Sequence, residues 1–455
     1  MTGRIPSIIP IARPISSEGS GFLTGRMGCC EDETSIRSEW EGCMENRHDG
    51  NPISVTPVSP EVESAPEVES APAAASETRV QPTDRFRHLD ALRAILMILG
   101  VFLHSAYIYA PGTWRVNDPV RSGFFHGVTE SIHFFRMPCF FILSGIFAQM
   151  LLEKYGRRKF TRSRMRRLAV PLIASALLLN SLEGYFIHAF PRDGNGNFLV
   201  FLASDTFRRF WQEGEWLGHL WFLVNVILYS LMAAAGAWMH SRIPSRREGK
   251  SWVPAPPVLG YRGGWFLFLL PAAHLGVLAL AHFFPFVYHR WGGAISLQEQ
   301  LWYFPYFLFG MILFLDKTLR EEFQRFRVWH LPTLVGALIL LQALKPHGKT
   351  LWGETATLYL QILMVWVFAS LLFAGFRRLL NRPSPALAYL SDASYTIYLF
   401  HHGCVVALGF FLMDFDWNIY LKFSLIVSAT LAWTLAIHHF GILRIKALRF
   451  LFNGK

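Results

Sequence analysis

The chain has 455 residues, of which 52% are hydrophobic, 15% aromatic and only 16% charged. This composition excludes an ordinary soluble enzyme and indicates a polytopic protein surrounded by membrane lipid. A formal net charge of +11 would suit a nucleic-acid-binding protein. The basic residues are spread over separate loops, however, and form no patches interleaved with aromatic residues, so we expect no nucleic-acid partner.

Residues 1–84 differ from the rest of the chain because they are polar and rich in Pro, Ser and Glu. The hexapeptide Pro-Glu-Val-Glu-Ser-Ala occurs at 60–65 and again at 66–71. Such a segment buries too little apolar surface to offset the entropy of ordering it. We therefore predict a disordered cytoplasmic tail at 1–84, followed by a transmembrane domain at 85–455. No signal peptide is recognisable, so the first span would direct insertion.

Hydropathy over a window of about 19 residues predicts an all-α bundle of membrane-spanning helices. The ten predicted spans cover residues 89–109, 128–152, 168–190, 217–239, 264–285, 298–315, 330–344, 353–375, 394–413 and 419–440. The seventh is the weakest prediction because it is short for a span. Most Lys and Arg residues fall at the termini and in the loops after even-numbered spans, so the positive-inside rule places both termini in the cytoplasm.

The first predicted span carries Arg93 and His104, and such groups are costly inside a membrane. Their separation of 11 residues turns an α-helix through about 1100°, so both side chains project from one face, about 16 Å apart along the axis. A permanent cation and a titratable imidazole on one face indicate a functional site. The alternative is that Arg93 reaches the interface and His104 makes only a structural hydrogen bond.

The second and fourth spans supply further candidate substrate-binding residues. His133 and Arg136, three residues apart, are neighbours on one helix face. Farther along the second span, Ser144 and Gly145 lie among bulky residues, which favours close helix packing over chemistry. His219 opens the fourth span at its outer end, where it could meet a polar substrate.

The ninth span combines hydroxyls and imidazoles in an otherwise apolar stretch. Tyr398 and His402 share one stripe of the helix, and His401 lies beside it. We expect at least one of the two histidines to face the bundle interior. A purely structural hydrogen bond between helices is the alternative for either.

The run from Lys154 to Arg167 holds eight cations, among them Arg158, Arg164 and Arg167. This density suits a multiply phosphorylated ligand such as coenzyme A. A solvated loop or a contact with anionic lipid would explain it equally well. The five cysteines show no paired metal-binding spacing, so we predict neither a metal site nor a disulfide framework.

The Arg-x10-His spacing of Arg93 and His104 is similar to the signature of the acyltransferase-3 family of membrane enzymes. Other stretches match recurrent motifs of that family: Phe140 to Gly145, Arg164 to Arg167, and Ser394-Tyr395 with Tyr398 and His401. The resemblance covers residues 85–455 and points to a branch that modifies glucans. It implies a ten-helix enzyme of the bacterial inner membrane that moves a succinyl group from cytoplasmic acyl-CoA to a periplasmic glucan, with no permanently bound cofactor.

With that resemblance, the residues suggest a mechanism. The phosphates of acyl-CoA, expected to be succinyl-CoA, would bind Arg93 and the basic run, and His104 would act as general base on a glucan hydroxyl. His133, Arg136 and His401 would position the acceptor or the acyl carboxylate. Arg136 is the best candidate to pair with that carboxylate. Direct transfer and an acyl-histidine intermediate both stay open.

Two other functions are compatible with parts of this pattern. An O-acetyltransferase of another surface polysaccharide would use the same kind of site. A transporter would also place ionisable residues inside the membrane, but the two halves show no convincing internal repeat. The sequence does not decide whether the 1–84 tail recruits the glucan-synthesis machinery.

Overall fold

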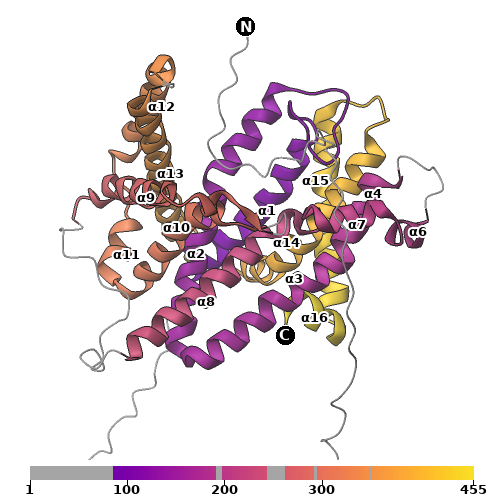
Figure 1. Ribbon diagram of the computed structural model, residues 1–455, viewed down its shortest axis with the longest axis horizontal. Helices are drawn as coiled ribbons and strands as arrows, with labels where there is room; N and C mark the ends of the chain where they lie inside the picture. The colour runs from indigo at the N-terminus through magenta and orange to yellow at the C-terminus, as the bar shows by residue number, and fades with distance from the viewer. Residues whose placement is uncertain (1–85, 191–196, 243–261, 292–294, 348–349) are drawn as a thin grey trace, which may run out of the picture. The chain divides into compact units, whose positions relative to one another are not determined.

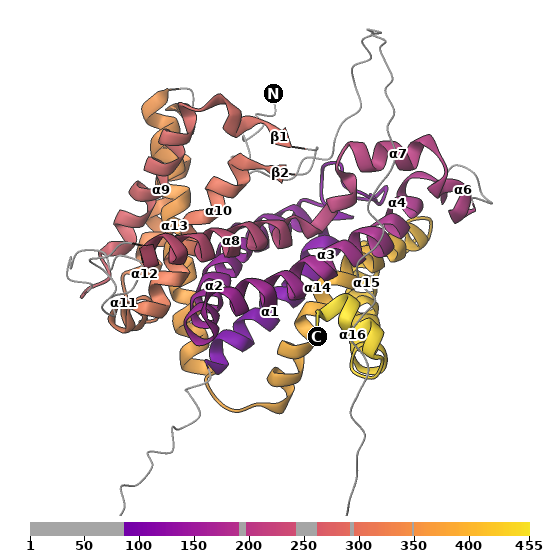
Figure 2. The same ribbon diagram turned by 60° about the horizontal axis from the view of Figure 1, so that its bottom comes forward.

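The computed structural model describes residues 86–190, 197–242, 262–291, 295–347 and 350–455. The predicted tail at 1–84 lies outside these residues. The described part is helical apart from two short antiparallel strands, β1 (Arg290–Trp291) and β2 (Ile295–Ser296). Figures 1 and 2 show a bundle in which α9, α12 and α13 lie together at one end and α4, α6 and α7 at the other. The all-α class is confirmed in this part of the chain.

The helices follow in chain order. They are α1 (Arg87–Tyr107), α2 (Gly123–Arg164), α3 (Val170–Ala174), α4 (Ser181–His188), α6 (Phe198–Leu202), α7 (Asp205–Gln212), α8 (Trp221–Arg242), α9 (Phe266–His282), α10 (Leu297–Leu315), α11 (Lys317–Phe323), α12 (His330–Leu344), α13 (Leu351–Leu379), α14 (Pro385–Leu412), α15 (Ile419–Ala436) and α16 (Lys446–Asn453). Short 3-10 segments are η3 (Glu215–Leu220), η5 (Pro285–Tyr288) and η6 (Lys345–His347).

Helix α1 packs against α2, α13, α14 and α15, and α2 packs in turn against α8 and α10. One face of α1 is almost wholly buried, with Leu89, Leu92 and Leu96 fully covered. In contrast, α12 presents apolar side chains such as Val335 and Ile339 outward, as expected of a surface that faces lipid. The inner helices α1, α2 and α14 therefore carry the polar groups.

Three π-helical segments interrupt the regular helices: η1 (Met165–Ala169), η2 (Ser175–Asn180) and η7 (Ile437–Ile442). Each inserts extra backbone into a turn and rotates the residues that follow. Segments of this kind are frequent at functional sites. Here η2 directly precedes α4, the helix that carries an acidic residue into the bundle.

Each of the ten predicted stretches contains a helix, and α12 has the predicted bounds. Within the described residues, six helical segments are long and apolar enough to span a membrane by length and composition. One of them, Gly123–His188, includes the second predicted span and most of the third. The chain is a multi-pass membrane protein, while the count of ten and the sidedness of the termini stay predictions.

The basic run from Lys154 to Arg167 was expected to lie in a loop, and this expectation is wrong. The segment is helical except at Gly156, whose φ of 70° is one that residues with a side chain rarely adopt. The chain therefore turns sharply at Gly156 and continues as helix into η1. The cations consequently project from a helical surface.

Helices α2 and α10 approach each other through two glycines, Gly145 and Gly310. A Cβ atom on Gly145 would collide with the carbonyl oxygen of Phe307, and one on Gly310 with that of Ile142. Small residues allow backbones to pack this closely in a membrane. The predicted packing role is confirmed at Gly145.

We predict that Gly310→Ala destabilises the folded protein. Because backbone atoms would have to move, overpacking should cost about 1–3 kcal/mol. Thermal unfolding in detergent, followed by size-exclusion chromatography, measures the effect. The matched control is Gly276→Ala on α9, where a Cβ meets no atom within 4 Å and stability should stay the same or rise slightly. Equal stability of the two variants would contradict the close contact.

Candidate functional site

Four histidines from three elements gather at the C-terminal end of α1. His104 lies in the last turn of α1, His219 in η3, and His401 and His402 in the middle of α14. The ring of His104 lies 5.2 Å from that of His401 and 4.7 Å from that of His402, between centroids. His219 stacks on His402 at 4.7 Å. These residues form what we call the histidine cluster.

A carboxylate that the sequence analysis did not single out completes the cluster. Glu183 on α4 accepts a hydrogen bond from Nδ1 of His402 at 2.7 Å, and both side chains are at most 6% exposed. A buried carboxylate held by an imidazole fixes the ring and leaves Nε2 facing the other way as the acceptor. His402 and Glu183 thus have the geometry of a base and the residue that orients it.

Glu183, His219 and His402 also place potential metal-ligand atoms within 4.8 Å of one another. The rings of His219 and His402 are nearly parallel, with an interplanar angle of 12°. Because a histidine nitrogen binds a metal in the plane of its ring, two parallel rings do not converge on one tetrahedral ion. The arrangement fits a carboxylate–imidazole pair better than a metal site.

Tyr398 and His401 belong to the same assembly. The hydroxyl of Tyr398 donates to the backbone oxygen of His219 at 2.9 Å, which joins α14 to η3. Nδ1 of His401 lies 2.8 Å from the backbone oxygen of Tyr398, so Nδ1 carries the proton. Nε2 of His401 is buried and has no hydrogen-bond partner among the described residues. It is therefore available to a substrate.

Arg136 is a buried cation against α1, and no carboxylate in the described part of the chain pairs with it. Its Nε donates to the backbone oxygen of Leu96 at 3.1 Å, and its guanidinium lies 5.8 Å from the Phe140 ring. Gly100 provides the room, because a Cβ there would lie 2.6 Å from a terminal nitrogen of Arg136. The guanidinium lies against Gly100, which is one turn of α1 before His104. An unpaired buried cation at this place is suited to binding an anionic group.

The remaining substrate-binding candidate, His133, lies one turn before Arg136 on α2. Its Nε2 is buried and has no hydrogen-bond partner among the described residues. No ring contact joins it to the histidine cluster in that part of the chain. The structure thus brings His104, His219, Tyr398 and His401 together, and places His133 beside them only through Arg136.

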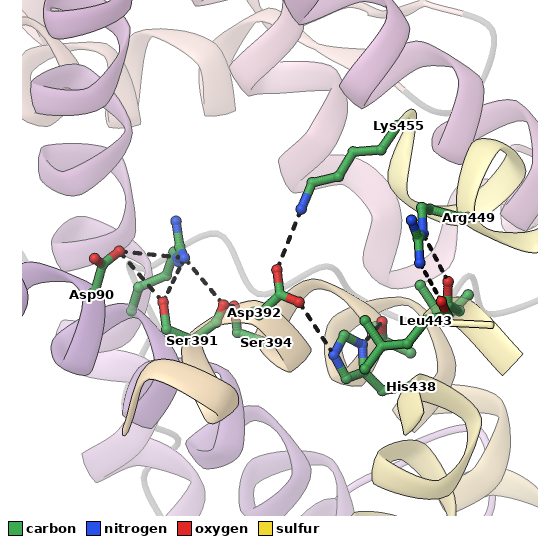
Figure 3. A network of polar contacts seen from close by, with 11 residues as sticks. Asp90, Ser391, Asp392, Ser394, His438, Leu443, Arg449 and Lys455 are labelled. Carbon is green, nitrogen blue, oxygen red and sulfur yellow. Dashed lines mark hydrogen bonds and ion pairs between the residues drawn. The ribbon is translucent and has the colours of Figure 1, made fainter. Parts of the chain in front are cut away.

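Arg93 lies at the opposite end of α1 from His104. Its guanidinium donates to the side-chain and backbone oxygens of Ser391 at 2.6 and 3.1 Å, and it lies 3.4 Å from the carboxylate of Asp90. Figure 3 shows Asp90 and Ser391 close to Asp392, which lies between His438 and Lys455. Arg93 is therefore anchored at the start of α14, far from the histidine cluster.

The basic run meets the same region. Tyr395, one turn after Ser391, donates to the backbone oxygen of Arg167 at 3.1 Å. Arg158 and Arg167 are exposed, whereas Arg164 packs 5.7 Å from the Phe160 ring. Nε of Arg164 is buried and unbonded among the described residues. Cations predicted to bind acyl-CoA thus lie near the Arg93 end of the bundle.

Sequence reasoning missed Glu183 and left the roles of His401 and His402 undivided. An acidic residue inside a predicted span was an available signal for Glu183. The sequence reasoning also missed Trp114, whose ring centroid lies 6.0 Å from that of His104. Trp114 sits in a loop, where no periodicity indicates which side chain it meets.

Comparison with known proteins shows the family of the chain. Residues 86–439 match the family model described as an acyltransferase domain of the acyltransferase-3 type. The chain belongs to the acyltransferase-3 family. Membership supports a transferase activity in a multi-pass membrane protein. No solved structure matches the chain.

Curated relatives cover most of the chain. Glucans biosynthesis protein C of Salmonella gallinarum is 28% identical over 381 residues, which cover 82% of this chain and 96% of the relative. The proteins of the same name from Salmonella paratyphi B and Salmonella agona are each 27% identical over 382 residues, with the same shares.

We predict that Gly100→Ala lowers acyl transfer without loss of folded protein. The added methyl group displaces only the end of the flexible Arg136 side chain. A misplacement of this kind can cost about a hundredfold in rate. Transfer rates and protein amounts in membranes measure the effect, with Gly127→Ala on α2, where a Cβ meets no atom within 4 Å, as control. Full activity of Gly100→Ala would contradict a role for the guanidinium position.

Proposed function

We propose that this acyltransferase moves a succinyl group from cytoplasmic acyl-CoA, specifically succinyl-CoA, to hydroxyl groups of a periplasmic glucan. Three observations support the proposal. The family indicates the reaction class, the name of the relatives indicates a glucan, and the unpaired buried cation Arg136 suits an anionic acyl group. An acetyl group would leave that cation without a counter-ion, which favours succinyl over the acetyltransferase alternative.

The observation that carries the proposal is the histidine cluster at the C-terminal end of α1. His104 keeps some exposed surface, whereas Glu183, His219, His401 and His402 are buried around it. A base must be reachable by substrate and supported by groups that hold its geometry. His104 is the member that a substrate can reach, and the rings of His401 and His402 pack against it.

The donor would approach from the end of α1 that carries Arg93. Phosphates of coenzyme A pair with cations, and the guanidinium groups of Arg158, Arg164 and Arg167 offer bidentate contacts. From Arg93 to His104 the axial distance along α1 is about 16 Å. The narrow pantetheine arm would cover that distance and present the thioester to His104.

In the reaction, His104 takes the proton of a glucan hydroxyl as the sugar oxygen attacks the thioester carbonyl carbon. A carbon–oxygen bond forms, the carbon–sulfur bond breaks, and coenzyme A leaves as a thiol after it receives the proton from His104. Glu183 acts through His402 and stabilises the positive charge that develops on the neighbouring His104. The acyl-histidine route would use the same residues.

Arg136 would hold the succinyl carboxylate while Nε2 of His401 accepts a hydrogen bond at the reacting group. His133, beside Arg136, and His219 would contact the acceptor. Tyr398 would act indirectly, because its hydroxyl already fixes the backbone of His219.

Mass spectrometry of periplasmic glucans tests this function in cells with the intact protein, with His104→Ala, or with none. We expect succinyl mass increments only with intact protein, because removal of a general base typically costs about 10²–10⁴ in rate. His439→Ala, which removes an exposed histidine of η7, is the matched control and should keep the modification.

Equal succinylation in the His104→Ala cells would contradict the role of this residue. Acetyl increments in place of succinyl increments would support an acyltransferase activity and contradict succinyl-CoA as the donor. Identical glucans in all cells, with the protein shown to be in the membrane, would contradict periplasmic glucan as the acceptor.

A further inference from the structure

The loop between α1 and α2 is held in place over the histidine cluster by several contacts. Nζ of Lys422 on α15 donates to the carboxylate of Asp118 at 2.8 Å, and both side chains are at most 3% exposed. The backbone N–H of Asp118 donates to the oxygen of Ile108. The side chain of Asn117 accepts from the backbone N–H of Trp114 at 2.8 Å. The position of Trp114 is thus fixed before any substrate binds.

Trp114 forms a group of three aromatic rings with His104 and Tyr107. The three centroid distances are 6.0, 6.0 and 6.1 Å, so the rings lie side by side and Trp114 is not enclosed between the other two. The indole plane is within 25° of the imidazole and within 17° of the phenol. All three residues keep some exposed surface. The imidazole and phenol planes differ by 42°, so the aromatic surface that adjoins the base is centred on Trp114 and is not flat.

A polar group from three elements lies next to this surface. Arg115, adjacent to Trp114, donates to Oε2 of Glu215 at 2.7 Å, and Nε2 of His188 lies 3.0 Å from the same oxygen. The three side chains are 24%, 16% and 26% exposed in that order. Oε1 of Glu215 makes no hydrogen bond to the residues that the structure describes. We call Arg115, Glu215 and His188 the polar triad.

We propose that Trp114 and the polar triad form a binding subsite for an uncharged gluco-oligosaccharide, in which one glucose ring stacks on the indole while an adjacent hydroxyl reaches His104. This proposal rests on the proposed function and adds the residues that select the acceptor. The C–H face of a hexose is apolar and matches an aromatic ring, and its rim hydroxyls match planar carboxylate and guanidinium groups.

The charges of the triad favour an uncharged ligand. Arg115 and Glu215 neutralise each other, so the subsite has no excess charge to attract an anion such as coenzyme A. The subsite also lies at the end of α1 opposite Arg93 and the basic run. Donor and acceptor would therefore bind at different ends of the same helix.

The test compares purified intact protein with Trp114→Ala and Trp114→Phe in detergent, using succinyl-CoA and linear gluco-oligosaccharides of increasing length. Release of coenzyme A gives kcat and KM for each acceptor. We expect Trp114→Ala to raise the acceptor KM about three- to tenfold and to leave the KM for succinyl-CoA unchanged. Trp114→Phe should restore most of the acceptor affinity, because a ring is still present.

Trp352→Ala is the matched control, because Trp352 is also exposed and also contacts a histidine, His347, but lies on α13. It should leave every constant unchanged. The intact protein should favour longer acceptors, and Trp114→Ala should lose part of that preference.

Two failures are distinguishable. An intact protein that does not succinylate any of these acceptors would overturn the proposed function itself. An intact protein that succinylates them while Trp114→Ala keeps the same acceptor KM, or loses kcat alone, would overturn only the subsite and leave Trp114 a purely structural residue. Loss of folded protein in Trp114→Ala is checked by size-exclusion chromatography. If it occurs, Trp114→Leu, which keeps apolar volume but has no aromatic ring, is measured in its place, and an unchanged acceptor KM in this variant would overturn the subsite.

Discussion

The buried guanidinium of Arg136 is the constraint on which the site depends. A cation inside an apolar bundle is costly unless other groups compensate it. Here a backbone oxygen of α1 and an aromatic ring of α2 do so only in part. The absence of a side chain at Gly100 is what allows the guanidinium to lie against α1. The bundle thus retains a positive charge beside the histidine cluster that a substrate anion can neutralise.

Helix α1 connects two chemically different ends. At one end Arg93 is tied to the start of α14 through Ser391, near the cations of the basic run. At the other end His104 meets the middle of α14, where His402 contacts both η3 and α4. A phosphate-rich donor and a hydroxyl-rich acceptor need different surroundings, and one helix supplies both. The arrangement is compatible with the proposed binding of the two substrates at opposite ends of α1.

The sequence was informative where a signal is local. Hydropathy gave the bounds of α12, and ionisable residues inside apolar stretches indicated His104 and Arg136. Pairing across the chain was not accessible, because Glu183 and His402 are 219 residues apart. The π-helical turn before α4, which sets the direction of Glu183, has no sequence signal that we could use. The loop that holds Trp114 depends on Lys422 and Asp118, another distant pair.

Transfer between opposite sides of the membrane is the central claim. The most direct measurement uses sealed proteoliposomes with succinyl-CoA enclosed inside and glucan supplied only outside, followed by analysis of the external glucan. The account predicts succinylated external glucan with the intact protein and none with His104→Ala or with protein-free liposomes. Succinylation that occurs only when donor and acceptor are on the same side would contradict it.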